Sequence, residues 1–226
     1  MENEDVTLWE QLKLGPIHLS SEKSVSKEAE KADKYKTLFE MVTGHRYPIE
    51  KHLYETADGY VNCVHRISGP RGTLARDNAQ LKIQKPVIIL QHGFMDSSAS
   101  FLCDGPDSLA MFFADQGYDV WLNNTRGNKF SKQHRYMDPC EPEFWDFSFQ
   151  EMAQYDQPAL FEFVLKKTGV ENVTYIGHSQ GTMQMFAALC ENLDFFKPKL
   201  NLVIMLAPVT RLTSVSTKRL QFLADN

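Results

Sequence analysis

The sequence lacks most of the features that assign a protein to a specialised class. Its four cysteines are widely spaced and form no Cys-x-x-Cys pair, so neither a zinc-binding nor a redox motif is present. Its 24 basic residues are outnumbered by 29 acidic ones, and the formal charge of −5 excludes the basic surplus typical of nucleic-acid-binding proteins. The longest apolar run, 202–209, is far shorter than the roughly 18 residues of a membrane span. What remains is a globular protein of 226 residues, 42% of them hydrophobic, which is enough for one sizeable core.

The N-terminal region is polar. It begins Met1-Glu2-Asn3-Glu4-Asp5 and has neither the basic start nor the apolar centre of a secretory signal peptide, so we expect no such signal. Residues 20–34 are rich in serine, lysine and glutamate, and we expect 1–34 to form a flexible segment. The cysteines are expected to be buried thiols, with one or two disulfides as the alternative.

Short apolar segments alternate with helical ones after residue 86. Ahead of them, Asp58-Gly59 joins two alternating runs and predicts a β-hairpin. We predict strands over 49–56, 60–67, 87–90, 118–122, 173–176 and 200–206, and helices over 27–43, 107–116, 149–167 and 180–192. Pro158 lies inside one of these helices and predicts a kink or a late start there. The pattern predicts an α/β fold whose mostly parallel sheet follows an N-terminal hairpin.

The candidate catalytic residue is Ser179, at the centre of the motif Gly177-His178-Ser179-Gln180-Gly181. The motif lies between a predicted strand and a predicted helix, which is the setting of a nucleophile elbow. The two glycines let the strand and helix backbones approach closely, so that the hydroxyl projects from a tight, strained turn. The N-terminus of the helix favours negative charge at this point. A glycine-serine turn without chemistry is the alternative.

A serine nucleophile needs two N–H donors aimed at the oxyanion that develops during the reaction. In an elbow of this kind, one donor belongs to the residue after the nucleophile, here Gln180, and the other to the loop after an earlier strand. That loop follows Leu90, and the backbone N–H of Phe94 is the predicted second donor. We interpret His92 as a structural histidine that bonds nearby backbone, rather than as a catalytic base. The sequence suggests no metal ion and no organic cofactor.

Six ordered blocks of sequence between residues 40 and 215 carry a resemblance to a known family. The blocks are YPIEKH with TADGY (47–60), LQHGF (90–94), VWLNNTRGN (120–128), FWDFSF with EMAQYDQPA (144–159), GHSQGT (177–182) and LAPV (206–209). Together they resemble the acid lipases, the gastric and lysosomal lipases of the α/β-hydrolase fold. Arg126 and Asp156 lie within these blocks, and we interpret each as part of a structural salt bridge or turn.

The resemblance implies hydrolysis of neutral lipid esters, either triacylglycerols or steryl esters, through an acyl-enzyme formed on Ser179. It also implies a lipid ester substrate bound at an interface, and leaves contact with a membrane surface open. We expect neither a nucleic-acid partner nor a transmembrane segment. Members of the family are secreted or lysosomal, which contrasts with the N-terminus of this sequence.

The sequence departs from the family after Ser179. A catalytic triad in this fold continues with an acid and then a histidine, yet all seven histidines of the sequence precede Ser179. We therefore expect the N-terminal part of a longer lipase, truncated before the last strands, with its hydrolase domain over 35–208 and the start of a helical cap over 209–226. The alternatives are a non-catalytic lipase-like protein without the triad Asp and His, a hydrolase completed by another chain, and another enzyme of the same fold, such as a thioesterase or peptidase.

Overall fold

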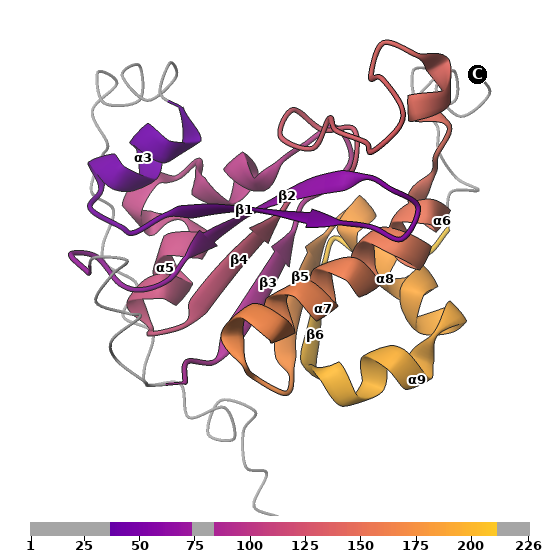
Figure 1. The fold of residues 1–226 in the computed structure, drawn as a ribbon. Coiled ribbons are helices and arrows are strands. Elements are labelled where there is room, and N and C mark those ends of the chain that lie inside the picture. Colours follow the sequence, from indigo (N-terminus) through magenta and orange to yellow (C-terminus); the bar gives the residue numbers. More distant parts are fainter. Residues whose placement is uncertain (1–36, 74–83, 212–226) are drawn as a thin grey trace, which may run out of the picture. The chain divides into compact units, whose positions relative to one another are not determined.

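The structure is a computed structural model that describes residues 37–73 and 84–211. Six strands within these residues form one sheet in the order β1-β2-β4-β3-β5-β6 (Figure 1). The strands are β1 (Glu50–Glu55), β2 (Val61–Ile67), β3 (Val87–Gln91), β4 (Asp119–Asn123), β5 (Val173–His178) and β6 (Leu200–Leu206). All six predicted strands are present, and the predicted bounds of the last are correct.

The sheet is mixed. Strands β1, β2 and β4 pair antiparallel, whereas β4, β3, β5 and β6 run parallel to one another. Every residue of β3 and of β4 is buried, as expected for continuous apolar strands covered on both faces. The predicted α/β fold, with a mostly parallel sheet and an N-terminal hairpin, is therefore confirmed.

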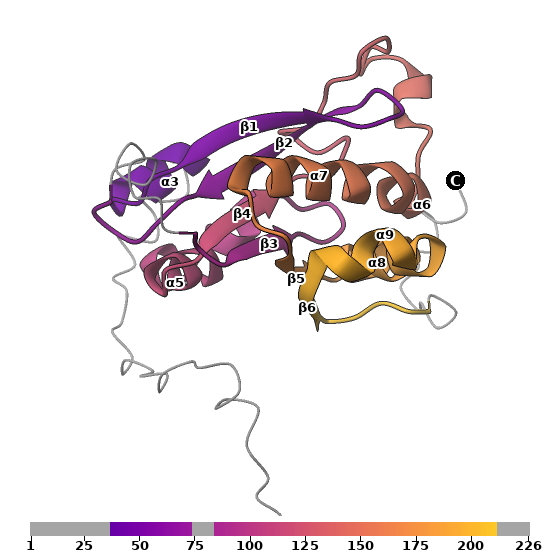
Figure 2. The same ribbon diagram turned by 60° about the horizontal axis from the view of Figure 1, so that its bottom comes forward.

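Helices cover both faces of the sheet. They are α3 (Leu38–Gly44), α5 (Leu109–Asp115), α6 (Phe149–Glu151), α7 (Gln157–Thr168), α8 (Gln180–Glu191) and α9 (Leu193–Phe196), with 3-10 turns over 98–102, 105–107, 142–145 and 197–199. Figures 1 and 2 show α3 and α5 on one side of the sheet and α7, α8 and α9 on the other. Alternate strand residues pack against the two sides: Leu90 and Leu122 join the first cluster, and Ile89 and Trp121 the second.

The helix bounds differ from the prediction at the first helix and in the predicted helix over 149–167. In the described residues, the first helix begins at Leu38, because Thr37 and Glu40 form a capping box; residues 27–36 of the predicted helix lie outside the described part. The predicted helix over 149–167 is divided into α6, a π-helical turn (Met152–Asp156) and α7. Pro158 lies in the first turn of α7, where its missing N–H costs least. The predicted late start is therefore correct for α7.

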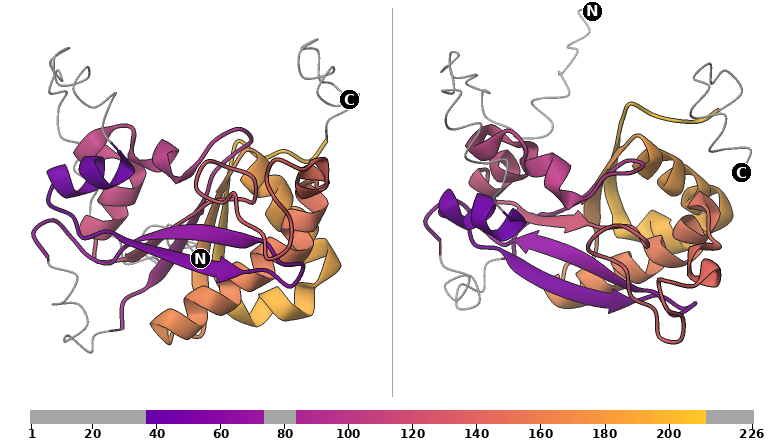
Figure 3. Two further views of the ribbon diagram at one scale, coloured as in Figure 1. Left: turned by 45° about the horizontal axis from the view of Figure 1, so that its top comes forward. Right: turned by 90° about the horizontal axis from the view of Figure 1, so that it is seen from above.

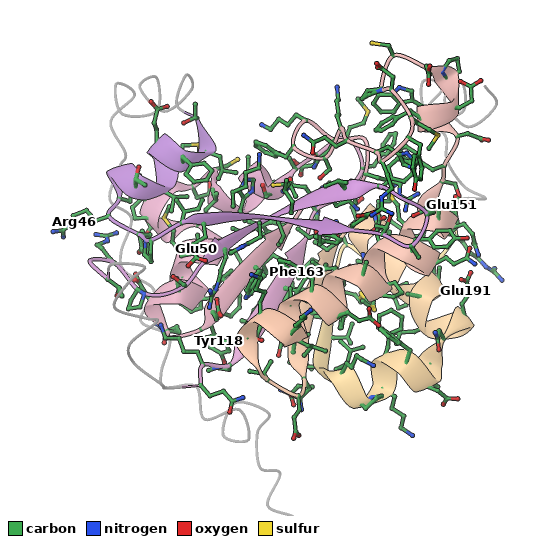
Figure 4. The ribbon with its side chains drawn as sticks, in the orientation of Figure 1. Arg46, Glu50, Tyr118, Glu151, Phe163 and Glu191 are labelled. Atoms are coloured by element: carbon green, nitrogen blue, oxygen red, sulfur yellow. The ribbon has the colours of Figure 1, made fainter. Side chains whose placement is uncertain are left out.

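Helix α7 packs against the hairpin strand β1. Phe163 extends from α7 toward β1 (Figure 4), with its ring centroid 5.9 Å from that of Tyr54 and 6.0 Å from that of His52. These contacts hold the hairpin against α7, one of the helices on the α7–α9 side of the sheet.

The connection between β4 and α6 runs beside the tip of the hairpin (Figure 3). The backbone N–H of Val61 donates to Gln133 and that of Arg135 donates to Gly59, at 2.9 and 2.8 Å. Gly59 has a φ of +97° that suits the turn of the hairpin. The Asp58-Gly59 turn thus anchors the long connection between β4 and α6.

The cysteines differ in part from the expectation. All four are free, but Cys63 alone is buried, whereas Cys103, Cys140 and Cys190 are exposed. The expectation of buried thiols is therefore wrong for three of them. No helix in 37–73 or 84–211 is long and apolar enough to cross a membrane. The expected flexible segment, 1–34, and residues 212–226 of the expected cap lie outside the described residues.

Candidate active site

Ser179 has a strained backbone. It connects the end of β5 to the start of α8 with φ 51° and ψ −116°, a combination that a side chain with a Cβ rarely adopts. Hydrogen bonds hold it there: its N–H donates to the carbonyl of Leu206 at 3.0 Å, and its carbonyl accepts from the N–H and the hydroxyl of Thr182 at 2.9 and 2.6 Å. The turn expected from the motif is present, and the surrounding structure maintains its strain.

The two motif glycines are sterically required. A Cβ atom at Gly177 would stand 2.9 Å from the backbone carbonyl of Gly181. A Cβ atom at Gly181 would stand 2.7 Å from the carbonyl oxygen of Gln91 and 3.0 Å from that of His92. Strand β5, helix α8 and the end of β3 can therefore meet only because neither position carries a side chain.

Gly93, in the loop after β3, lies against Ser179. A Cβ atom at Gly93 would stand 3.0 Å from the Ser179 Cβ and 3.4 Å from its Oγ. Among the described residues, no acceptor receives a hydrogen bond from the backbone N–H of Phe94 or of Gln180. The structure thus brings together the loop of Phe94, the N-terminus of α8 and Ser179, which are the places where the sequence predicts the nucleophile and the two donors.

His92 is buried and has partners on both ring nitrogens. Its Nδ1 lies 2.8 Å from the carbonyl oxygen of Gly93, and its Nε2 lies 3.1 Å from the backbone nitrogen of Thr125 and 3.1 Å from Nδ2 of Asn128. Burial lowers the pKa of His92, against opposing contributions from the Gly93 carbonyl and Asp96. The prediction of a structural histidine bonded to nearby backbone is confirmed.

The described residues provide no histidine base for Ser179. None of them accepts a hydrogen bond from its hydroxyl in the structure. His178 is exposed, and its Nδ1 lies beside Gly93, 3.3 Å from the point that a Cβ of that glycine would occupy. His178 and Ser179 share this neighbourhood without a hydrogen bond between them.

Arg126 links the hairpin turn to the π-helical turn. Its guanidinium donates to Asp156 at 2.6 and 3.0 Å and to Asp58 at 2.6 and 3.0 Å, and it lies 3.9 Å from the ring centroid of Tyr60. Burial alone would lower the pKa of Arg126, but the two carboxylates outweigh burial and raise that pKa. The interpretation of Arg126 and of Asp156 as salt-bridge residues is confirmed: the two form an ion pair with each other, and Asp58 is a second partner of Arg126.

The sequence did not predict a network of buried hydrogen-bonded side chains, most of them amides, among the strands and helices that lead to Ser179. Asn123 donates to Gln91 at 2.7 Å, Gln157 donates to Gln184 at 2.9 Å, and Tyr54 donates to Asn123 at 2.8 Å. These side chains are almost fully buried and come from β1, β3, β4, α7 and α8. The available signal is a polar residue at the end of an apolar strand, as at Gln91 and Asn123. Such a residue requires a partner when it is buried.

Apolar side chains stand exposed beside the elbow. Phe94 is 52% exposed and Met95 is 85% exposed, and the φ of Met95 is +56°. A separate hollow of about 750 Å³ lies between β1 and α7 and includes none of the predicted site residues in its lining. In the described part of the chain, no three His, Cys, Asp or Glu side chains gather in a way that could hold a metal ion.

Comparison with known proteins shows which families this chain resembles. The family described as the α/β hydrolase fold matches residues 86–224, and the partial α/β-hydrolase lipase region matches residues 38–105. Gastric triacylglycerol lipase of Bos taurus is 40% identical over 196 residues, which is 85% of this chain and 48% of that protein. Lysosomal acid lipase/cholesteryl ester hydrolase of Homo sapiens is 42% identical over 171 residues, which is 75% of this chain and 41% of that protein.

The chain spans about half the length of the curated relatives it matches. Among solved structures, an epoxide hydrolase from Vigna radiata aligns with a TM-score of 0.50 and 16% identity, covering 78% of this chain and 46% of that chain. At this identity the likeness concerns the fold alone.

Proposed function

The chain belongs to the acid lipase family of α/β hydrolases, and on this premise we propose that it forms part of a lipid ester hydrolase with Ser179 as the nucleophile. The observation that carries the proposal is the backbone of Ser179, with a φ of 51° between β5 and α8. Strain of this kind persists only where the surrounding structure enforces it, and it gathers at functional sites. Here it presents the hydroxyl at the edge where the loop after β3 meets α8.

The reaction would proceed in two steps. The Ser179 oxygen attacks the ester carbonyl carbon, its proton passes to a general base, and the carbonyl electron pair moves to oxygen. The backbone N–H groups of Phe94 and Gln180 would stabilise that oxyanion, since both donors lack an acceptor among the described residues. Collapse of the tetrahedral intermediate breaks the bond to the leaving oxygen, which takes the proton from the base and departs as the alcohol. Water then hydrolyses the acyl-enzyme to the carboxylic acid and its second proton returns to the Ser179 oxygen.

The proposed substrates are neutral lipid esters. The relatives described above are named a gastric triacylglycerol lipase and a lysosomal acid lipase/cholesteryl ester hydrolase. Phe94 and Met95 follow Gly93 in the loop that lies against Ser179, and their exposed side chains suit an apolar acyl chain or a lipid interface better than a polar substrate.

A non-catalytic lipase-like protein is the second candidate, because of the histidines. All seven precede Ser179 in the sequence, and none of those described bonds its hydroxyl. The general base would have to come from a polypeptide segment beyond the printed sequence or from another chain. A protein that lacked such a segment would retain the elbow without the means to activate it.

Labelling with a serine-directed alkyl phosphonate, together with hydrolysis of matched ester, thioester and amide substrates, tests the proposal. Both measurements use the 226-residue chain and the natural polypeptide that contains it. We expect the natural polypeptide to label at Ser179 and to cleave the ester, and Ser179→Ala to abolish both. Ser100→Ala, which changes another partly buried serine, is the control and should label normally. Absence of labelling from both polypeptides would favour the non-catalytic protein, and amide cleavage without ester cleavage would contradict a lipase.

A further inference from the structure

The orientation of one peptide group, that between Gly93 and Phe94, depends on His92. The carbonyl oxygen of Gly93 can only accept a hydrogen bond, so His92 Nδ1, 2.8 Å away, must carry the proton. The backbone N–H of Thr125 can only donate, so His92 Nε2, 3.1 Å away, must be bare. Two partners of opposite character therefore select one tautomer of the neutral imidazole.

The same peptide group contains the N–H of Phe94. In a trans peptide, the C=O and the N–H point in opposite directions, and none of the peptide bonds within 37–73 and 84–211 is cis. Because the His92 ring bonds the Gly93 carbonyl, it also sets the direction of the Phe94 N–H, which points away from the ring. This N–H has no acceptor among the described residues, and Gly93 itself lies against the Ser179 side chain.

We propose that His92 is a positioning residue, which aims the Phe94 N–H at the oxyanion by holding the carbonyl of the shared peptide group. The proposal rests on the proposed function, because the oxyanion arises only if Ser179 attacks an ester. It assigns His92 neither a proton-transfer role nor a contact with substrate, since both ring nitrogens are already engaged.

Residues in the loop after β4 hold the other side of the His92 ring. Asn128 donates to His92 Nε2 at 3.1 Å and to the side-chain oxygen of Asn124 at 2.9 Å. Asn124 in turn accepts from the backbone N–H of Ser98 at 3.0 Å. The Nε2 side of the ring is thereby fixed by residues that follow the neighbouring strand β4. Burial favours the neutral ring and lowers the pKa of His92, so the Nε2 acceptor persists into acid solution.

Two substitutions of His92 separate aiming from simple packing. In His92→Asn, the amide nitrogen occupies the same δ position as Nδ1 and can still donate to the Gly93 carbonyl. In His92→Gln, the amide lies one bond further out, near the Nε2 position, so it can bond Thr125 but leaves the Gly93 carbonyl without its donor. Both variants lose ring volume and one of the two bonds, so a purely structural role predicts similar losses in the two.

The experiment measures kcat and KM for a chromogenic ester with the natural polypeptide. We expect His92→Gln to lower kcat by roughly a hundredfold, the order of a lost oxyanion donor, with KM unchanged. His92→Asn should retain kcat within about tenfold of the unmodified protein, because the carbonyl donor remains. The control is His52→Asn: His52 is a partly buried histidine of β1 that bonds Glu50 and packs against Trp121 and Phe163, so its loss should not cause this selective fall in kcat.

The outcomes distinguish this inference from the function on which it rests. Failure of the unmodified protein to hydrolyse any ester would overturn both. Hydrolysis by the unmodified protein, with kcat equal in the Asn and Gln variants, would overturn the role of His92 alone. Nitrogen NMR of the 226-residue chain gives an independent check: a protonated Nδ1 with a bare Nε2 is expected, and the opposite tautomer would refute the geometry whatever the activity.

Discussion

Replacing Gly181 by alanine should destabilise the protein and disable the elbow. The added methyl would stand 2.7 Å from both the carbonyl oxygen and Cγ of Gln91, and 3.0 Å from the carbonyl oxygen of His92. A carbon atom ordinarily stays about 3.3 Å or more from a carbonyl oxygen, so α8 and β3 must separate by roughly 0.6 Å. Strand β3 pairs with β4 on one side and β5 on the other, which leaves it little freedom to move.

The magnitude follows from overpacking. Extra methyl groups in tightly packed regions cost about 1–3 kcal/mol, and we expect the upper end because the obstacle is backbone rather than a flexible side chain. Displacement of the α8 N-terminus would also move the Gln180 N–H away from Ser179. Misplacement of a reacting group by about 1 Å costs on the order of a hundredfold in rate. The phosphonate labelling of Ser179 should therefore slow by more than the fraction of unfolded protein explains.

Urea unfolding and the labelling rate measure the two effects. Gly44→Ala is the matched control, because Gly44 also lies in a helix but has no atom within 4 Å of an added Cβ and no positive φ. That variant should be neutral or more stable by up to about 1 kcal/mol, the gain in helix propensity from glycine to alanine. The tight approach of α8 to β3 would be refuted if Gly181→Ala unfolded at the same urea concentration as the unmodified chain and labelled at the same rate.

Three further predictions concern buried charge, surface charge and acid stability. Arg126→Met should cost about 3–5 kcal/mol in urea unfolding, because it leaves the fully buried carboxylate of Asp156 without its partner. Arg135→Met, which breaks an exposed pair, should leave the unfolding midpoint unchanged, and an equal loss in the two variants would contradict the role of burial. Burial, with Lys51 and Lys129 nearby, lowers the pKa of His65 from 6.5 to about 4, so the unfolded chain binds one more proton between these values. Stability should consequently fall by up to about 3 kcal/mol as the pH decreases from 6.5 to 4, and His65→Asn should flatten that part of the profile.

The order of the strands and helices could be predicted because their signals are local. Continuous β-branched runs, such as 87–90, predict strands that are covered on both faces, and β3 is fully buried. Asp58-Gly59 specifies its turn through the positive φ that Gly59 adopts at +97°. Helix ends were less predictable, since they depend on single capping contacts such as that between Thr37 and Glu40.

Burial of individual side chains was harder to predict than secondary structure. Trp121, Phe144, Trp145 and Phe147 are equivalent as aromatic residues in a sequence, but Trp145 is 44% exposed and only Trp121 and Phe144 are fully buried. Trp145 instead packs over Gly127, whose added Cβ would stand 2.9 Å from the indole ring. The residue type alone cannot distinguish a buried aromatic side chain from an exposed one, because exposure depends on the segment against which the side chain packs.

In the candidate site, too, features set by local contacts could be predicted from the sequence, whereas features set by distant contacts could not. The strained turn at Ser179 is a property of five consecutive residues, so the motif alone suffices to predict it. The tautomer of His92 depends on Thr125, which lies 33 positions away on a different strand end, and no periodicity in the sequence connects the two. A contact of this kind arises only because parallel pairing places the ends of β3 and β4 side by side, with Gln91 opposite Asn123. Once that register is known, a buried histidine next to a glycine loop can be examined for a role in aiming the backbone, and the asparagine and glutamine variants then decide whether it has one.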